Sequence, residues 1–385
     1  MKKAKIYFKN IYYCSHQKFN VSPDKKGQPK IHKDPVFQKS YIYGSANNVK
    51  HCMRCTYTDI IGDENADYET IFQKFVEIKN GKARLTQGGV SVNPDFKLNK
   101  TIIFGAMLSG CTNAKYLKMA LKACMNIGEF KPLHTLLASK YSGGGVNTGT
   151  SKVKTVYVKK EGDKTYDKST ECDNLLDFFK ANPEFDKYPK DELNNNELNI
   201  FEEETANGIY AYEMMVDMCK FGKICTTKIE FTKEGKQDIG KLLQNDGWTK
   251  QVINNETYLV PPLEDIKSMW EAFAQTQFEW EFQSNNSTHG SVNQYLRTCI
   301  SLNEPQLWLQ STRAKIAPDN NSAYIVINDN YEEVKTFNSP LLEQYMTVDG
   351  DKVKYDDYAH KNAYKELLEL GDKCIDEAYP KSMTE

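Results

Sequence analysis

Two kinds of hydrophobic spacing alternate irregularly along this 385-residue chain, and this mixture excludes most repetitive architectures. Apolar alternation or short apolar runs, typical of strands, occur at residues 4–14, 41–43, 101–108, 153–158, 208–219 and 324–327. Helical spacing occurs at residues 45–61, 67–79, 113–128, 132–141, 173–180, 263–280, 289–299 and 356–379. Because helices are inserted between strands without a strict strand–helix repeat, the sequence predicts an α+β fold rather than a doubly wound sheet.

The length allows one elaborated domain or two smaller ones, and we expect a single domain over residues 1–385. Insertions are expected at about residues 15–40, 62–100, 161–207 and 223–260. Residues 224–231 and 257–260 are expected to be the arms of a long hairpin. No apolar run approaches the roughly 20 residues that a membrane span requires, and the N-terminal alternation predicts a strand instead of a signal peptide. We therefore expect a cytoplasmic protein.

The net charge of -2 conceals two halves of opposite sign. Residues 1–160 carry 27 lysines and arginines against 10 aspartates and glutamates, whereas residues 161–385 carry 23 against 42. A strongly basic half indicates a polyanionic partner, and nucleic acid is the first to consider because displaced counterions supply much of its non-specific affinity. The alternative is a solvated lysine-rich surface, since only four of these cations are arginines.

The ten cysteines do not indicate a metal centre. Only Cys52 and Cys55 form a CxxC pair, and no second pair or histidine pair has the spacing of a zinc site. Buried, reduced thiols are therefore expected, with no metal and no cofactor.

The first candidate binding site is residues 44–54, where small residues precede a predicted helix. Ser45 is expected to cap this helix, whose first N–H groups favour an anion. Lys50 and Arg54, four residues apart, share one helix face. With Asn47 and His51, they suit a sugar-phosphate backbone; an ordinary capped helix is the alternative.

The second candidate site is a glycine-rich segment that contains Gly143, Gly144, Gly145 and Asn147. We expect a flexible loop whose amides contact phosphates or a neighbouring subunit, and a plain linker is the alternative. The segment lacks the Gly-Lys-Ser/Thr ending of a Walker loop, so nucleotide hydrolysis is not expected.

The third candidate site has His289, Asn293 and Arg297 at intervals of four, which predicts a polar, cationic stripe on one helix face. A catalytic histidine needs a positioned nucleophile or carboxylate, and the sequence shows neither. Adjacent acids such as Glu332 and Glu333 point to different faces. No hydrolase, zinc-protease or dinucleotide motif occurs, so we do not expect an enzyme.

The order of these features resembles the backbone subunits of CRISPR Cascade complexes, the Cas-seven family of the RAMP superfamily, and most resembles their type I-F branch. The similarity is carried by residues 44–54, 111–116, 212–231 and 289–298, the last of which is similar to a His-Ser-x-x-x-x-x-Leu-Arg-Thr helix. The chain departs from that branch at residues 143–147, where glycines stand in place of aromatic and arginine residues.

The resemblance implies a modified RRM-like or ferredoxin-like palm with a helical fingers insertion and a protruding thumb hairpin, the thumb being residues 223–260 or 62–100. It implies a non-catalytic subunit that binds guide RNA (crRNA) and stacks head to tail with further copies. Other Cascade subunits and target DNA, recognised through the guide, are the remaining implied partners in antiviral defence. The RNA contacts would come from the three candidate sites.

Related type III subunits cut RNA with an aspartate in an early loop. Here the corresponding turn at residues 44–48 has no carboxylate, and Asp34 lies before Pro35, so no cleavage is expected. A stand-alone sequence-independent RNA-binding protein and an enzyme such as a RAMP-type endoribonuclease, with a site formed only in three dimensions, are the alternatives.

Overall fold

The structure is a computed structural model of the chain. It describes residues 4–17, 19, 29–61, 74–79, 82–87, 111–113, 119–121, 123–147, 157–159, 167–168, 199–225, 244–245, 247–253, 255–280, 292–305, 311–346 and 353–379.

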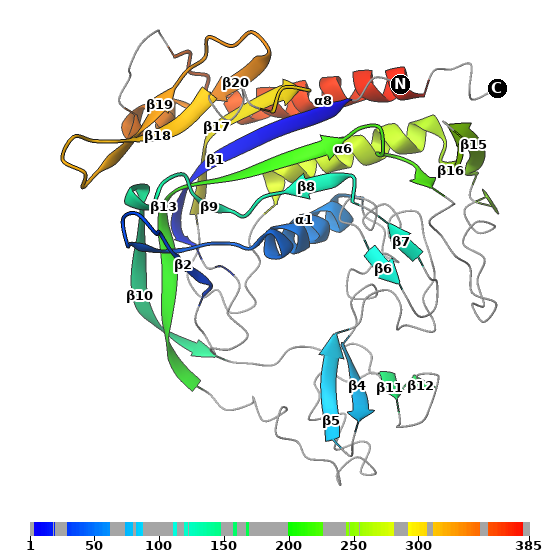
Figure 1. Ribbon diagram of the computed structural model, residues 1–385, viewed down its shortest axis with the longest axis horizontal. Helices are drawn as coiled ribbons and strands as arrows, with labels where there is room; N and C mark the ends of the chain where they lie inside the picture. Colours follow the sequence, from blue (N-terminus) through cyan, green and yellow to red (C-terminus); the bar gives the residue numbers. More distant parts are fainter. Residues whose placement is uncertain are drawn as a thin grey trace.

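A seven-stranded antiparallel sheet forms the centre of the molecule (Figure 1). Five of its strands run in the order β10 (Ala138–Asn147), β13 (Asn199–Asp217), β1 (Lys5–Gln17), β17 (Val292–Leu302) and β20 (Val334–Asn338). Two short strands, β8 (Met125–Ile127) and β9 (Lys131–Pro132), also pair with β13. The first strand of the chain therefore lies between β13 and β17.

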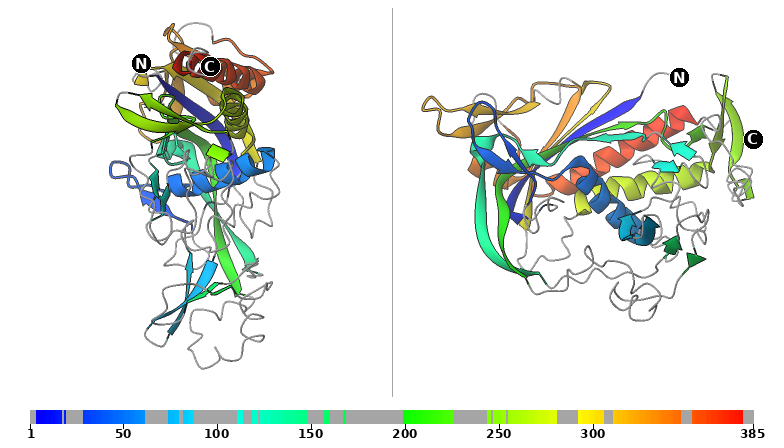
Figure 2. Two further views of the ribbon diagram at one scale, coloured as in Figure 1. Left: turned by 90° about the vertical axis from the view of Figure 1, so that its right-hand side faces the viewer. Right: turned by 60° about the horizontal axis from the view of Figure 1, so that its bottom comes forward.

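Three helices cover one face of this sheet (Figure 2): α1 (Ala46–Ile61), α6 (Leu263–Glu279) and α8 (Ala359–Ala378). Phe8 and Cys14 of β1 are buried in one cluster with Cys52 of α1, Trp270 of α6 and Leu367 of α8. Side chains two residues apart on a strand point to the same side, so the even-numbered residues of β1 from Ile6 to Cys14 face the helices. The main core lies between the sheet and these helices.

The crossing of α6 and α8 depends on one glycine. A Cβ atom at Gly371 would lie 1.8 Å from the Trp270 ring, so only glycine lets the indole lie against α8. Trp270 Nε1 also donates a hydrogen bond to Leu368 O at 3.1 Å. The two helices are thus held together by close packing and by a polar contact.

A smaller apolar cluster covers part of the opposite sheet face. Ile11 of β1 and Leu296 of β17 pack there with Ile325 of β19 (Ala323–Ile327) and Leu342 of the 3-10 helix η4 (Pro340–Tyr345). β18 (Thr312–Ile316) pairs with β19 to form a hairpin. Both faces of the central strand β1 are therefore buried.

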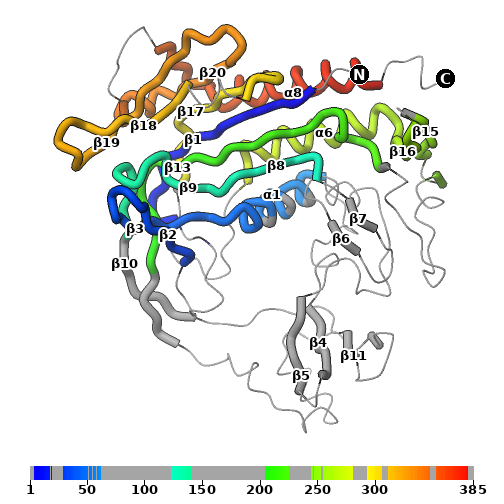
Figure 3. The backbone as a smooth tube through the Cα atoms, in the orientation of Figure 1, coloured from blue at the N-terminus to red at the C-terminus, as the bar shows by residue number. Residues whose placement is uncertain are grey.

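The connectivity is β1, α1, the group β8–β9–β10, then β13, α6 and β17. In space the second strand group lies next to β13, which lies next to β1, which lies next to β17. Figure 3 traces this path along the backbone. The chain thus combines a β-α-β-β-α-β order with one antiparallel sheet and two helices on the same face.

β13 and β10 together extend beyond the end of β1 as a two-stranded ribbon (Figure 1). Residues 206–217 of β13 pair with β1, whereas residues 199–208 pair with β10. Gly208, at the junction, has φ +129°, and a Cβ atom there would lie 2.2 Å from Leu137 O. Only glycine fits this position.

Four smaller sheets complete the described structure. One contains β12 (Asp167–Lys168), β11 (Tyr157–Lys159), β4 (Lys74–Lys79) and β5 (Lys82–Gln87) in that order. Another contains β14 (Ile224–Cys225), β16 (Glu256–Val260) and β15 (Thr249–Ile253). The remaining two are the pairs β2 (Ile31–Lys33) with β3 (Ser40–Ile42), and β6 (Cys111–Asn113) with β7 (Met119–Leu121). No helix in the described part of the chain has the length and apolar character needed to cross a membrane.

The expectation of a mixed α+β fold is confirmed. The predicted strands at residues 4–14, 41–43, 208–219 and 324–327 are present, as are the helices at 45–61, 263–280 and 356–379. The expected hairpin arms pair, with Ile224 opposite Leu259. Residues 101–108 and 173–180 lie outside the described residues.

Four predicted helices are wrong over the residues that are described. Residues 74–79 are strand β4, and residues 111–128 contain strands β6, β7 and β8. Residues 132–141 contain a single 3-10 turn, η1 (Thr135–Leu137), followed by β10. Residues 292–302 form β17. In the three cases that involve the main sheet, pairing with β13 or with β1 outweighs local helix preference.

Candidate nucleic-acid interface

The start of α1 forms as the sequence predicted. Ser45 Oγ accepts a hydrogen bond from Asn48 N at 3.4 Å, and Ser45 therefore caps the helix. Gly44 exchanges two backbone hydrogen bonds of 2.9 Å with Phe130, which ties the helix start to the segment leading into β9. Asn47 is exposed and Lys50 is half-buried. The side chains of His51 and Arg54 lie outside the described residues.

The β2–β3 hairpin leads directly into this helix start, and Asp34 closes its turn. Asp34 Oδ1 accepts hydrogen bonds from Val36 N at 2.8 Å and Phe37 N at 3.0 Å. Asp34 Oδ2 accepts another from Thr135 Oγ1 at 3.0 Å. The bond from Phe37 N is the main cause that lowers the pKa of Asp34, and the other two add to it. The carboxylate thus stabilises the turn.

Aromatic rings lie along the same hairpin. The His32 ring stacks on Tyr43 with centroids 4.0 Å apart, and His32 Nε2 lies 3.8 Å from Glu129 Oε1. Phe37 meets His134 edge to face at 5.1 Å. His32 is exposed, so its ring is available to a partner. Exposed planar rings next to cations are the side chains on which single-stranded nucleic acids stack.

The β2–β3 hairpin, β9 and the start of β10 lie on the same side of the molecule, at the left of Figure 1. These elements carry four exposed lysines, which we call the basic end: Lys33, Lys39, Lys131 and Lys140. Lys140 pairs with Glu204 at 3.2 Å. Within the described part of the chain, the other three form no ion pair, and β10 contacts β3. The nearby Asp34 and Glu129 already contact other groups. These two carboxylates and Glu204 keep their charges, so the four lysines exceed them by one and the local surface has a small net positive charge.

The predicted glycine loop is instead part of strand β10. Gly143 and Gly144 lie opposite Glu203 and Glu202 of β13, and the strand continues to Asn147. The expectation of a flexible loop is wrong for Gly143, Gly144, Gly145 and Asn147, because pairing with β13 fixes their backbone. β10 is the edge of the sheet, so only alternate N–H groups are directed away from β13.

The predicted polar stripe on a helix does not exist. Asn293 and Arg297 lie in β17, opposite Cys14 and Ile11 of β1, and His289 lies outside the described residues. The register shifts at Leu296, which has no partner on β1. Because Cys14 and Ile11 face opposite sides of the sheet, this bulge directs Asn293 and Arg297 to opposite sides as well.

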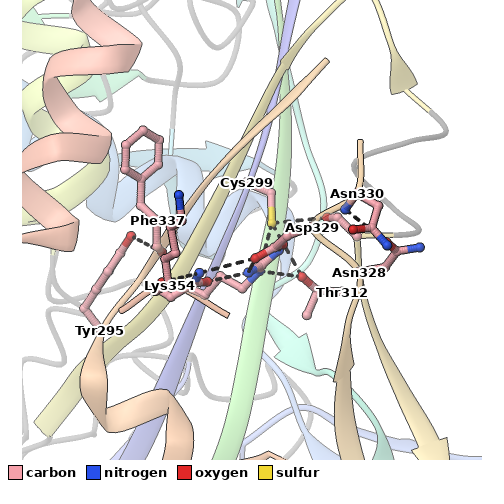
Figure 4. Close-up of polar contacts among 11 residues, drawn as sticks. Tyr295, Cys299, Thr312, Asn328, Asp329, Asn330, Phe337 and Lys354 are labelled. Atoms are coloured by element: carbon pink, nitrogen blue, oxygen red, sulfur yellow. Dashed lines mark hydrogen bonds and ion pairs between the residues drawn. The ribbon is translucent and has the colours of Figure 1, made fainter. Parts of the chain in front are cut away.

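Arg297 is completely buried, with 0% exposure, and it cannot be a surface cation. It forms an ion pair with Asp329 and donates a hydrogen bond to Asn338, while its Nε donates to Thr312 Oγ1 at 2.8 Å (Figure 4). Its role is therefore to join β17 to β20 and to the β18–β19 hairpin. Burial acts to lower the pKa of Arg297, but the neighbouring Cys299 and Asp329 raise it overall.

The sequence reasoning missed the β2–β3 hairpin as a surface element. Residues 31–33 and 40–42 are short strands around the Asp34-Pro35 pair, which is a turn signal. Only the second strand was predicted. The stacked His32 and the exposed Lys33 and Lys39 had no motif of their own.

Comparisons with known proteins match this chain to solved structures, but not to a family model or a curated protein. No protein-family model matches the sequence, and no curated protein is similar to it. One similar solved chain is described as "CRISPR RNA-guided surveillance complex, pre-nicking", with a TM-score of 0.42 and 9% identity over 97% of this chain and 100% of that chain. Another, described as "CRISPR RNA-guided surveillance complex", has a TM-score of 0.35, with the same identity and coverage. Similarity of this size does not establish a common fold or function.

Proposed function

We propose that this chain is a non-catalytic subunit that binds guide RNA in a CRISPR surveillance complex and stacks along that RNA. The observation that carries the proposal is the β-α-β-β-α-β connectivity. In the sheet, the group β8–β9–β10 lies next to β13, then β1, then β17. This is the order of a ferredoxin-like or RRM-like domain, which many RNA-binding proteins use. In this reading, the main sheet with α1 and α6 is the palm of the resembled family.

The chemistry of the basic end supports sequence-independent RNA binding. Lys33, Lys39 and Lys131 present ammonium groups to phosphates, and the exposed His32 offers a ring for stacking. Phosphate and ring contacts carry no base identity, which suits a subunit whose guide sequences vary. The cap of α1 adds N–H groups beside these lysines.

The protruding thumb of the resemblance corresponds best to the ribbon of β10 and the first part of β13. This ribbon extends beyond the main sheet, whereas the described part of residues 223–260 forms a three-stranded sheet. In a head-to-tail stack, the ribbon would reach the next copy along the RNA. The opposite net charges of the two halves of the sequence would favour that orientation.

The proposal of no cleavage is supported by the contacts of Asp34. Its two carboxylate oxygens accept three hydrogen bonds, from Val36 N, Phe37 N and Thr135 Oγ1. A nuclease carboxylate must instead be available to the scissile phosphate, a metal or a proton. Cleavage by the parent protein that is lost in Asp34→Ala would overturn this part of the proposal.

Co-expression with a repeat-spacer array tests the proposed function. We expect the purified protein to protect RNA of one defined length and to form particles of several copies. The triple variant Lys33→Glu, Lys39→Glu and Lys131→Glu should lose this RNA. The matched control changes the exposed Lys361, Lys365 and Lys373 of α8 to glutamate and should retain it.

Two outcomes distinguish the alternatives. RNA of random length would favour a stand-alone RNA-binding protein and would contradict a guide-binding subunit. A triple variant that still protects RNA of normal length would exclude the basic end as the guide contact. Circular dichroism of each variant confirms that the fold is retained.

A further inference from the structure

One face of the β2–β3 hairpin carries three rings, which we call the aromatic face: His32, Tyr41 and Tyr43. His32 lies directly opposite Tyr41, and directly opposite residues in an antiparallel pair share a face. Tyr43 N donates to Lys30 O at 3.3 Å, so the pairing continues past β3 and Tyr43 lies on the same face as Tyr41. Ile42, between the two tyrosines, is buried in the main core. The aromatic face is therefore turned away from that core.

A glutamate lies beside these rings. The backbone bridge between the start of α1 and the segment before β9 brings Glu129 next to the hairpin. Glu129 Oε1 lies 3.8 Å from His32 Nε2. Burial is the main cause that raises the pKa of Tyr41 and of Tyr43, and the charge of Glu129 adds to the shift in both. The carboxylate thus lies close to all three rings.

The Glu129 carboxylate is accessible to a ligand. The Glu129 side chain is 38% exposed, and that of its neighbour His32 is 46% exposed. The distance of 3.8 Å between the two is longer than a hydrogen bond. Within the residues that the structure describes, no group donates a hydrogen bond to this carboxylate. Its oxygens can therefore still accept hydrogen bonds from a bound molecule.

A carboxylate at this position is unfavourable for binding phosphates alone. Lys33, Lys39 and Lys131 attract the phosphates of a strand, whereas Glu129 repels them. A carboxylate accepts hydrogen bonds and donates none, so its partner on the strand must be a donor. The donors of a single strand are the base edges and, in RNA, the ribose 2′-hydroxyl. Because only the hydroxyl is present at every ribonucleotide, it is the donor that suits a sequence-independent contact.

We propose that Glu129 accepts a hydrogen bond from a ribose 2′-hydroxyl when a base of single-stranded RNA stacks on the aromatic face, and that it thereby selects RNA over DNA. This inference rests on the proposed function, because it concerns the sugar specificity of the same basic end. Bases of any sequence stack on aromatic rings, and the glycosidic bond keeps the ribose next to its stacked base. A DNA strand has no donor at the 2′ position, so it would leave the carboxylate unpaired among phosphates.

Binding of three labelled strands by the full-length protein, measured by fluorescence anisotropy, tests this proposal. Oligo-U, oligo-dU and 2′-O-methyl oligo-U present the same bases and phosphates, and only oligo-U has a hydrogen-bond donor at the 2′ position. The parent protein should bind oligo-U at least about tenfold more tightly than either of the others, as expected for one hydrogen bond to a charged group.

Three variants separate the sugar contact from charge and from stacking. Glu129→Ala should bring the three affinities together, because the acceptor of the hydroxyl and the repulsion of phosphates are both removed. The control Glu332→Ala, at an exposed position just before β20, removes the same charge and should keep the preference for oligo-U. Tyr41→Ala should weaken the binding of all three strands by a similar factor, since stacking does not involve the 2′ group. Circular dichroism of each variant confirms that the fold is retained.

Four results would overturn the inference. One is equal binding of oligo-U and oligo-dU by the parent, and another is a preference for oligo-U that survives in Glu129→Ala. A preference for RNA that disappears when oligo-A and oligo-dA replace the uridine strands would assign Glu129 to a base edge instead of the sugar. Absence of binding to every strand would leave a protein as the partner of the aromatic face.

This inference and the proposed function fail in different ways. After co-expression with a repeat-spacer array, Glu129→Ala should protect guide RNA of the same length as the parent, because the lysines of the basic end remain. A parent protein that protects guide RNA of one length but binds oligo-U and oligo-dU equally would refute this inference alone. A parent that carries no guide but prefers oligo-U through Glu129 would refute the proposed function alone.

Discussion

Breaking the buried ion pair of Arg297 gives the sharpest test of how β18, β19 and β20 are attached to β17. Arg297 is 0% exposed, while the Asp329 side chain is 27% exposed, so the guanidinium depends on Asp329 for most of its charge compensation. Asp329→Ala removes that compensation and leaves the cation buried. Thr312 and Asn338 still accept hydrogen bonds from Arg297, but neither carries a charge.

Removing one partner of a buried ion pair costs about 3–5 kcal/mol, because the remaining charge stays desolvated. The partial exposure of Asp329 places the expected loss near the lower end, at about 3 kcal/mol. With a urea m-value of about 3 kcal/mol/M, the unfolding midpoint should fall by about 1 M. Replacing both partners by apolar residues, as in Arg297→Met with Asp329→Leu, should recover much of this loss.

Urea unfolding followed by tryptophan fluorescence measures these changes, and hydrogen exchange locates them. The amides of the β18–β19 hairpin should lose protection first, since Arg297 fixes its base. The exposed pair of Lys267 with Asp376, at 2.7 Å, is the control, and Asp376→Ala should cost less than about 1 kcal/mol. A loss below about 1 kcal/mol in Asp329→Ala would show that Arg297 does not require its partner.

Three further predictions follow from single positions. Gly371→Ala should lower the free energy of unfolding in urea by about 3 kcal/mol, because the added methyl group meets the Trp270 ring. The control Gly128→Ala, whose added Cβ would have its nearest contact at 3.5 Å, should change that free energy by less than about 0.5 kcal/mol. Tyr212→Phe should cost about 1–3 kcal/mol, because its hydroxyl bonds Asn10 and the carbonyl of Gln277 in the core; the exposed Tyr358→Phe is the control. The contribution of Asp34 to stability should be complete above about pH 4 and be lost as the pH falls through its lowered pKa. The Val36 and Phe37 amides should therefore lose exchange protection in acid, and Asp34→Asn should remove this pH dependence.

The sequence predicted a helix correctly where its cap and its buried residues all lie within that one helix. In α1, Ser45 supplies the cap, and Val49, Cys52, Met53 and Tyr57 are buried at intervals of three and four. Cap and apolar face both lie within 16 consecutive residues. The α6 and α8 helices were predicted correctly for the same reason, because their buried residues also repeat within one element.

Local signals failed where a distant strand sets the conformation. Residues 113–128 have helix-forming Ala, Leu and Lys side chains, but Met125–Ile127 pairs with β13, about 90 residues further along the chain. The glycines at 143–145 similarly looked like a flexible loop until their pairing with residues 201–203 was known. Pairing partners so far apart leave no periodic mark in either segment.

The β17 strand shows why spacing alone misplaced part of the site. Residues four apart share a face in a helix and also in a regular strand, so the spacing of Asn293 and Arg297 predicted a common surface under either assignment. The bulge at Leu296 inserts one unpaired residue between them and reverses the alternation. Arg297 consequently faces β18, β19 and β20, where Asp329 pairs with it and Asn338 accepts its hydrogen bond, so it is not available to a nucleic acid. RNA binding by this protein must therefore be argued from exposed cations such as those of the basic end, because a guide contact at Arg297 would require its bonds to Asp329, Thr312 and Asn338 to break.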